Sequence, residues 1–401
     1  MRHEDPRHMG LGKTRASPIA LQSRGHGRPG RKAAAARPHP AQWALALALI
    51  LYAAAGALLA GCGSDRGLAS IGEVPGDDRN RQAFIDWAGL RNPVLSDDSV
   101  SLKDPCVVYR DGTFYVFTSG ASYRTKDFKR YEGPFEGYGS PDITRLGHDS
   151  YIMVYQVKDT EHPGPGAGVD PDSPDNLYRR LFYKTSPDLE HWSEGDDLFP
   201  ALPPDRNIDG ALALHGDRFY LGFKKGVTVQ EFRVARSIGA SIDGRWTDPQ
   251  KAHAGEGCLL DKLIPIIGDT ITRWAENYQF IRIDGTWRMI ATARDPARPI
   301  DFGYMRSHEP FIYRLGGPED SLESWTNWVD KTQLMVPYED WNTLMHANSA
   351  YLCDWRDHDG YFYLFYAGTN QETEDGRGHG RIGVVRSKDL ADWRLPGDTG
   401  S

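Results

Sequence analysis

Five ionisable residues stand at comparable places in the sequence, each at the start of a stretch rich in Val, Ile, Leu, Tyr and Phe. They are Asp104, Asp142, Asp209, Glu276 and His346. Carboxyl groups that crowd together repel one another and lose hydration, which raises the pKa of some while others stay ionised. One carboxylic acid can then donate a proton while another carboxylate accepts one, as glycoside hydrolysis requires. For any single Asp, the plainer interpretation is a cap on a turn.

Each of these residues opens a predicted β-hairpin. The stretch 104–120, DPCVVYRDGTFYVFTSG, runs through β-forming residues, turns at Asp-Gly and resumes as an aromatic-rich strand. The same pattern returns from residues 142, 209, 276 and 346. The turns fall at or near Gly112, Gly147, Gly216, Gly285 and Gly360.

A second element recurs after the hairpins, as in SPDLEHW and SKDLADW. Its Ser and Asp can bond their own backbone in a turn, and the following aromatic ring can be buried between sheets. The later hairpins start 67, 67 and 70 residues apart, enough for four short strands each. The sequence therefore predicts an all-β protein, a five-bladed β-propeller with four-stranded antiparallel blades.

In a propeller the first strand of every blade lines the central channel. Residues at one repeat position therefore meet around one axis. We expect the five hairpin-opening residues to converge at the rim of a shared funnel, where they can face a ligand.

The N-terminal segment has the features of an export signal. Residues 1–40 hold nine Lys and Arg against two acids, and AQWALALALILYAAAGALLAGC follows from Ala41 to Cys62 without a charge. Leu59-Ala60-Gly61-Cys62 resembles a bacterial lipobox, in which the Cys is acylated. We expect residues 1–61 to be a leader and lipoprotein signal peptide; an uncleaved membrane anchor is the alternative. Either way the protein is exported and tethered to a bacterial membrane, at the cell surface or in the periplasm.

Residues 62–86 are polar and glycine-rich and predict a flexible tether, followed by the propeller over 87–398. The net charge is −8 for the whole chain and +7 for residues 1–40, so −15 remains for the exported part. This acidic balance argues against a nucleic-acid partner. After Cys62, the remaining Cys106, Cys258 and Cys353 fit no zinc spacing and are expected to be buried, inert thiols. We expect a monomer.

The repeats resemble glycoside hydrolase family 43, or a near relative among the five-bladed propeller glycosidases. The resemblance rests on NPVL, KDPCVVYRDGTFYVFTS, IDGALALHGDRFYLGF, ENYQFIRIDGTWRMI and the S-x-D-L-x-x-W turns. It implies an inverting mechanism in which Asp104 is the general base, Asp209 modulates the pKa of the acid, and Glu276 is the general acid. The family often has Glu-Gly-Pro where this chain has Glu276-Asn277-Tyr278. Glu309 is therefore the competing acid, although it precedes no hairpin in phase with the others.

Other residues are candidates for contact with a substrate. Trp274 and Tyr278 flank Glu276 and are suited to stack on a sugar ring, with packing between blades as the alternative. Asp142 and His346 complete the predicted substrate-binding set. The resemblance also implies that His346 lies near an axial calcium or water cluster; no cofactor is required for the reaction, and a structural calcium at the axis is a weaker expectation.

These observations favour an arabinofuranosidase- or xylosidase-like hydrolase of polysaccharide or oligosaccharide bonds. The first alternative is a glycan-binding surface lipoprotein that has lost catalysis. The second is a scaffold propeller with a protein partner, which leaves the acidic ring unexplained. The sugar, the linkage and endo versus exo cleavage depend on long loops such as 161–176.

Overall fold

The computed structural model describes residues 84–164, 170, 177–227, 229–254, 262–263, 275–294, 308–371 and 380–398. All of them belong to one compact unit, 79–401. The predicted leader, the lipidation residue Cys62 and nearly all of the tether lie outside the described residues. Within the described residues, no helix combines the length and the apolar composition needed to cross a membrane.

The described strands form five sheets, each built on antiparallel pairs of consecutive strands. Blade one contains β1 (Cys106–Arg110), β2 (Thr113–Phe117), β3 (Ser122–Thr125) and β4 (Tyr131–Phe135). Blade two contains β5 (Gly139–Gly147), β6 (Ser150–Lys158), β7 (Arg179–Ser186) and β8 (Asp196–Asp197). Blade three contains β9 (Asn207–His215), β10 (Arg218–Lys225), β11 (Val229–Arg236) and β12 (Gln250–Lys251), and β14 (Lys262–Leu263) also pairs with β11.

Blade four contains β15 (Ala275–Ile283), β16 (Thr286–Arg294), β17 (His308–Leu315) and β18 (Asn327–Gln333). The short strand β13 (His253–Ala254) joins it in parallel to β18, next to α2 (Leu322–Trp325). Blade five contains β19 (Met345–Asp354), β20 (Phe362–Thr369) and β21 (Arg381–Ser387), with α3 (Arg356–Asp359) in its hairpin connection. The five predicted hairpins are therefore the inner strand pairs of five blades.

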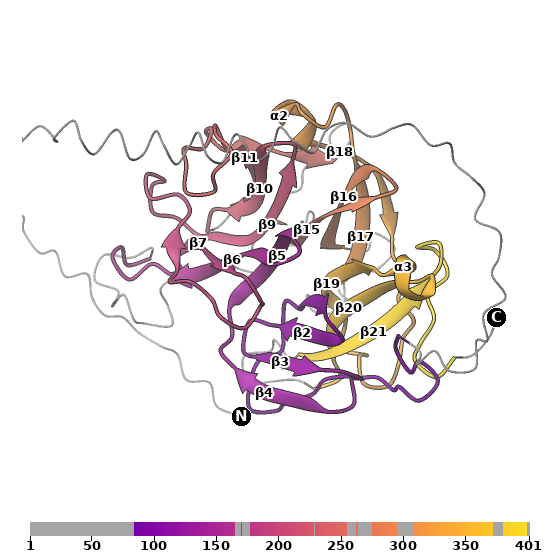
Figure 1. Ribbon diagram of the computed structural model, residues 1–401. Helices are drawn as coiled ribbons and strands as arrows, with labels where there is room; N and C mark the ends of the chain where they lie inside the picture. Colours follow the sequence, from indigo (N-terminus) through magenta and orange to yellow (C-terminus); the bar gives the residue numbers. More distant parts are fainter. Residues whose placement is uncertain are drawn as a thin grey trace, which may run out of the picture. The chain divides into compact units, whose positions relative to one another are not determined.

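The blades follow one another around the molecule in chain order, so that blade one lies beside blade five (Figure 1). The inner strands contact each other in a closed circuit, from β1 to β5, β9, β15, β19 and back to β1. Such a circuit defines a central channel. The predicted five-bladed antiparallel propeller is confirmed.

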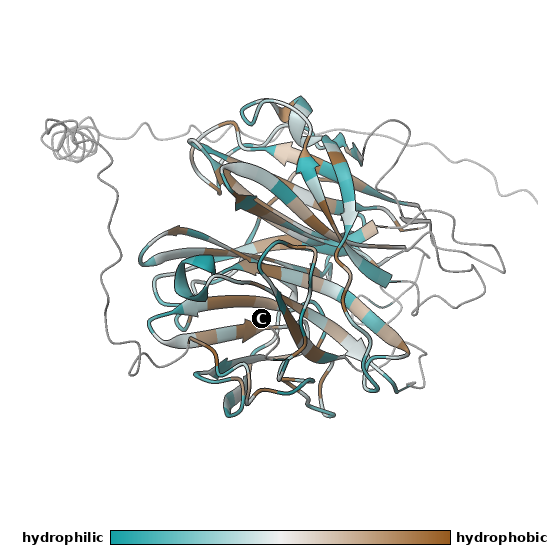
Figure 2. Cartoon of the chain, turned by 90° about the vertical axis from the view of Figure 1, so that its right-hand side faces the viewer, coloured by the Kyte–Doolittle hydropathy of each residue, from teal (hydrophilic) through white to brown (hydrophobic). Residues whose placement is uncertain are grey.

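Hydrophobic residues gather along the strands, while hydrophilic residues are frequent at loops and edges (Figure 2). The buried residues form five clusters, and each cluster joins two neighbouring blades. For example, Val154 of blade two packs with Leu212 of blade three, and Ile290 of blade four packs with Leu364 of blade five. Because every blade needs a neighbour on each side to cover its faces, the ring stabilises the single blades.

Local sequence explains the hairpins. Asp111 and Gly112 both have positive φ, at 48° and 82°, and Asp284 and Gly285 repeat this geometry at 48° and 76°. Two consecutive residues with positive φ define the tight turn that matches the twist of antiparallel strands, which explains the Asp-Gly pairs.

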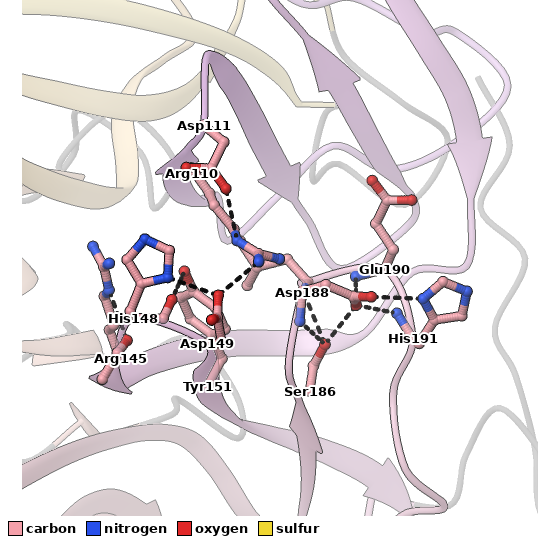
Figure 3. Close-up of polar contacts among 12 residues, drawn as sticks. Arg110, Asp111, Arg145, His148, Asp149, Tyr151, Ser186, Asp188, Glu190 and His191 are labelled. Atoms are coloured by element: carbon pink, nitrogen blue, oxygen red, sulfur yellow. Dashed lines mark hydrogen bonds and ion pairs between the residues drawn. The ribbon is translucent and has the colours of Figure 1, made fainter.

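The predicted Ser-Asp turns form as expected. Ser186 Oγ accepts hydrogen bonds from the backbone N–H groups of Asp188 and Leu189, and Asp188 Oδ1 accepts those of Glu190 and His191 (Figure 3). The same four bonds recur at Thr125 with Asp127. Three of them recur at Ser387 with Asp389. Leu189, which has a positive φ, is buried between blades one and two.

The segment before blade one closes the ring against blade five. Asn92 Nδ2 donates to the carbonyl of Val384 at 3.0 Å, and Asn92 Oδ1 accepts the N–H of Val384 at 2.9 Å. Leu95 then forms an antiparallel bridge with Ile382. NPVL therefore extends the outer edge of β21 and joins the two ends of the propeller.

Cys106 and Cys353 are both unpaired and buried, and burial raises the pKa of each thiol. The expectation of inert thiols is met at these two positions. Cys258 lies outside the described residues.

Candidate active site

One residue on the inner strand or entry of each blade has an unusual backbone. Each has a side chain that can hydrogen-bond and a φ in the left-handed region, which non-glycine residues seldom adopt and which Asp and Asn tolerate best. The five are Asp104, Ser140, Asp209, Asn277 and Ser349, with φ of 55°, 42°, 55°, 53° and 53°. We call this set the polar ring.

Asp104 is the most heavily bonded member of the polar ring. Its Oδ1 accepts hydrogen bonds from Asn277 Nδ2 at 2.8 Å and from Ser349 Oγ at 2.6 Å. Its Oδ2 accepts from Ser140 Oγ at 3.0 Å and from Ser119 Oγ. An ionised carboxyl group only accepts hydrogen bonds, so four donors suit the charged form of this side chain.

Asp209 is joined to Asp104 through two shared neighbours. Its Oδ1 lies 3.2 Å from Ser140 Oγ, and its Oδ2 accepts the backbone N–H of Asn277 at 3.3 Å. Burial raises the pKa of Asp209, the charge of Lys224 opposes that rise, and Glu276 and Asp104 add to it. Because the hydroxyl of Ser140 carries one proton, a protonated Asp209 can donate to Ser140, which in turn donates to Asp104.

Glu276 lies immediately before the ring member of blade four. His308 Nε2 lies 2.8 Å from its Oε1, and Lys224 Nζ lies 3.4 Å from its Oε2. The same Lys224 Nζ is 3.8 Å from Asp209 Oδ2, and the Lys224 side chain is fully buried. A buried cation thus lies between two predicted catalytic carboxyl groups and offsets their mutual repulsion.

Asp142 occupies a position one layer further inside the channel than Ser140. It is buried, and its Oδ2 accepts the backbone N–H of Leu212 at 2.7 Å, which links blades two and three. Burial raises the pKa of Asp142 to about 7, and the backbone hydrogen bonds of Leu212 and Ile143 limit the rise. Ser140 rather than Asp142 has the left-handed backbone of the ring in blade two, and Asp142 lines the small cavity beside it.

His346 lies among residues of blades four and five and contacts Glu309, the competing candidate for the general acid. Its Nδ1 lies 2.9 Å from Glu309 Oε1, and its ring is stacked 3.5 Å from that of Tyr338. The ring position of blade five belongs to Ser349, so His346 does not occupy the position that was expected. In the part of the chain that the structure describes, no three His, Cys, Asp or Glu residues are grouped to hold a metal. The axial calcium therefore remains a prediction.

Tyr278 is oriented for packing. Its ring stacks 3.9 Å from that of Phe232, and its hydroxyl donates to the carbonyl of Ala275 at 2.9 Å. This arrangement matches the alternative of packing between blades. Trp274, the other predicted stacking residue, lies outside the described residues.

A small cavity of about 30 Å³ lies at the polar ring, lined by all five ring residues and by Asp142. That volume holds about one water molecule, so a larger ligand does not fit between these residues.

The sequence pattern located two of the five ring positions, Asp104 and Asp209. The pattern of ionisable residues does not predict Ser140, Asn277 and Ser349, because their side chains carry no charge. Irregular strand pairing also moves the register by a few residues. It occurs between Gly139 and Asp142, between Glu276 and Gln279, and between Met345 and Asn348. Counting back seven or eight residues from the hairpin glycine finds Ser140 and Asn277, but α3 lengthens the fifth hairpin and hides Ser349.

These features define the class of protein as a five-bladed β-propeller with an acid-containing polar ring at one mouth of its channel. Two solved structures share the fold. A thermostable family-43 glycoside hydrolase is 14% identical, with a TM-score of 0.51 over 78% of this chain and 97% of that one. An α-L-arabinofuranosidase from Lactobacillus brevis is 12% identical, with a TM-score of 0.51 over 77% of this chain and 98% of that one.

At these identities the likeness concerns the fold, and it agrees with the fold that the sequence resemblance implied. A scan against protein-family models found no match, and neither did a search of curated proteins.

Proposed function

We propose that the protein is an exported, inverting glycoside hydrolase. The observation that carries this proposal is the pairing of Asp104 and Asp209 through Ser140 and Asn277 at the mouth of a five-bladed propeller, with Glu276 next to them. Carboxyl groups in different surroundings can divide into a proton donor and a proton acceptor. The fold similarity to a family-43 glycoside hydrolase supports the same function.

The roles follow from the contacts. Asp104, whose four donors suit its charged form, acts as the base that removes a proton from water. Glu276 protonates the departing sugar oxygen. Asp209 tunes that donation, and Lys224, which contacts both Asp209 and Glu276, balances the charge. His308 orients Glu276 through its 2.8 Å contact.

For the substrate, we propose terminal arabinofuranosyl or xylosyl units on oligosaccharides. The L. brevis structure with the same fold is an α-L-arabinofuranosidase, which supports the arabinosyl choice. Asp142 and Tyr278 shape the channel beneath the site, and we assign them a supporting rather than a sugar-contacting role, because both are buried and bonded within the protein.

A second candidate function is glycan binding without catalysis. It is favoured by the cavity of only about 30 Å³ at the ring and by the four donors that already occupy Asp104. A base in a hydrolase must still reach a water molecule, and the experiment below separates the two functions.

The test is a screen of the full chain, kept soluble in detergent, against nitrophenyl arabinofuranosides, xylosides and galactosides. We expect release of nitrophenol from an arabinofuranoside or a xyloside. Proton NMR of the first product should show the opposite anomeric configuration to the substrate. Sugar binding without hydrolysis would favour the second function, and retention of configuration would rule out the inverting mechanism.

For location, we propose that Cys62 is acylated and anchors the protein to a bacterial membrane. The Leu-Ala-Gly-Cys that follows the uncharged segment 41–61 supports this proposal. Cys62→Ser should release the protein from membranes or block its processing. An unchanged mature mass together with unchanged membrane attachment would show that Cys62 carries no lipid.

A further inference from the structure

A second cavity lies on the same face of the propeller as the polar ring. Its volume is about 250 Å³, and its walls come from the segment 199–204 between blades two and three and from residues at the ends of β6, β7, β8 and β9. The inner strands begin at the polar ring, so β6 ends and β7 begins on that face. We call this space the inter-blade pocket.

The inter-blade pocket adjoins the polar ring. Asn207 lines it and precedes Asp209 by two residues on β9, so their Cα atoms are at most about 7 Å apart. Gln156 near the end of β6 accepts the N–H of Asp209 at 3.0 Å, which holds the same two blades together. The inter-blade pocket and the polar ring are therefore neighbours along β9.

Asn207 has an unused hydrogen-bond acceptor. Its side chain is 4% exposed, and its Nδ2 donates to the carbonyl of Arg179 at 3.2 Å. Its Oδ1 is buried and has no hydrogen-bond partner among the residues described here. A buried acceptor without a partner is unfavourable, so a ligand that brings an O–H or N–H donor is favoured.

The charged groups of the inter-blade pocket are paired within the protein. Arg180 forms ion pairs with Asp197 and with Glu161, and His162 Nδ1 lies 3.1 Å from Asp159 Oδ2. Because each charge has a partner, the pocket does not call for an ionic ligand.

The remaining wall is apolar. Leu181, Leu202 and Phe199 line the pocket, and Phe199 is fixed by ring contacts with Phe223 and Trp246 at 5.7 and 5.3 Å. A sugar ring combines hydroxyl donors at its edge with an apolar C–H face, which suits an aromatic wall opposite polar groups. A volume of about 250 Å³ is just below the usual 300–1,000 Å³ of pockets for drug-sized ligands, so it fits a single ring.

We propose that the inter-blade pocket is a second saccharide subsite, which holds a neutral sugar unit next to the unit at the polar ring. This proposal rests on the proposed function for its substrate class. It makes the protein selective for oligosaccharides over single glycosides. Asn207 Oδ1 accepts a hydrogen bond from a hydroxyl of the bound sugar unit. Phe199 and Leu202 contact the apolar face of that unit.

The test fills the pocket from an exposed position. Ala201 lines the pocket and is exposed, so Ala201→Trp should occupy it without disturbing the core. We expect kcat/KM for arabinotriose or xylotriose to fall at least about tenfold and that for the matching nitrophenyl glycoside to change less than about twofold. Ala201→Ser, which keeps the volume, and Ala391→Trp, at an exposed alanine in a blade-five turn, should behave like the parent.

Calorimetric titration of the full chain with the same two trisaccharides tests the pocket even if no glycoside is hydrolysed. Binding that weakens about tenfold in Ala201→Trp and stays unchanged in Ala391→Trp supports the subsite, whatever becomes of the hydrolase proposal. Equal binding by Ala201→Trp and the parent, or no binding of either trisaccharide by the parent, would overturn it. Equal loss of kcat/KM on the trisaccharide and the nitrophenyl glycoside would also overturn it.

Discussion

At the scale of single residues, the polar ring joins two acids of different character. Asp104 accepts four hydrogen bonds from side chains, whereas burial raises the pKa of Asp209 and Ser140 links the two. Two carboxyl groups that both contact one hydroxyl can titrate as a coupled pair. The two acids therefore have different surroundings: side-chain donors surround Asp104, whereas burial raises the pKa of Asp209.

Glu276 and Glu309 compete for the role of general acid, and their contacts separate them. Glu276 lies next to Lys224 and His308, while Glu309 is buried against His346 and Tyr338. We expect Glu276→Gln to lower kcat most on substrates with poor leaving groups, because a nitrophenolate needs little protonation. Glu309→Gln should affect all leaving groups alike. Kinetics on natural and activated glycosides measure both, and the reverse pattern would assign the acid to Glu309.

The raised pKa of Asp142 predicts that the free energy of unfolding depends on pH. Its pKa in the folded state is about 7, against 3.8 for an ordinary Asp. A group whose pKa is higher in the folded state stabilises the fold below its unfolded pKa, and the contribution is lost as pH rises through about 7. In Asp142→Asn the amide oxygen can still accept the N–H of Leu212.

The free energy of unfolding of Asp142→Asn minus that of the parent should therefore be larger at pH 8 than at pH 4. The expected change in this difference is on the order of 4 kcal/mol. Urea unfolding at both pH values measures this difference. If the variant differs from the parent by the same amount at pH 4 and pH 8, Asp142 is not protonated in the folded protein at neutral pH.

At the scale of elements, the repeated hairpins were predictable because they follow short-range rules. Alternating β-formers around Asp111-Gly112 or Asp284-Gly285 require only local turn geometry. The exact ring residues were less predictable, since irregular pairing near Ser140 and Asn277 depends on contacts with neighbouring blades. Lys224 and His308 could not be assigned from sequence, because they come from the second and third strands of blades three and four and reach Glu276 only after the blades pack.

The closure of the ring depends on Asn92. Its side chain bonds both the N–H and the carbonyl of Val384, and it donates to Glu339 Oε2 at 2.8 Å. Asn92→Ala should lower the free energy of unfolding by about 2 to 4 kcal/mol, because backbone groups of β21 lose their partners. Asn370→Ala, at an exposed asparagine that donates to the carbonyl of Asp340, should cost less than about 1 kcal/mol. Urea denaturation of both variants and the parent measures these losses. If Asn92→Ala loses no more stability than Asn370→Ala, Asn92 does not hold the ring closed.

At the scale of the whole molecule, the channel has two different ends. At the polar ring, the channel narrows to a cavity of about 30 Å³. The other end opens into a cavity of about 660 Å³. The hairpin ends of the inner strands line that cavity, including Arg110, Arg145 and Arg282. The acids predicted to be catalytic lie at the first end, beside the inter-blade pocket. The proposed catalytic acids and the proposed saccharide subsite therefore share one face of the propeller.

Asp104 is the proposed base of a glycoside hydrolase. On the arabinofuranoside or xyloside that the parent cleaves best, Asp104→Asn should lower kcat by about 10² to 10⁴-fold, because an amide cannot take a proton from water as a carboxylate does. The matched control is Asp111→Asn, at an exposed aspartate with the same left-handed backbone in the hairpin turn of blade one, which should retain the parent's activity. Steady-state rates of the three proteins at one pH measure this effect. We expect a large loss of kcat in Asp104→Asn alone. An Asp104→Asn variant as active as the parent would show that Asp104 is not the base.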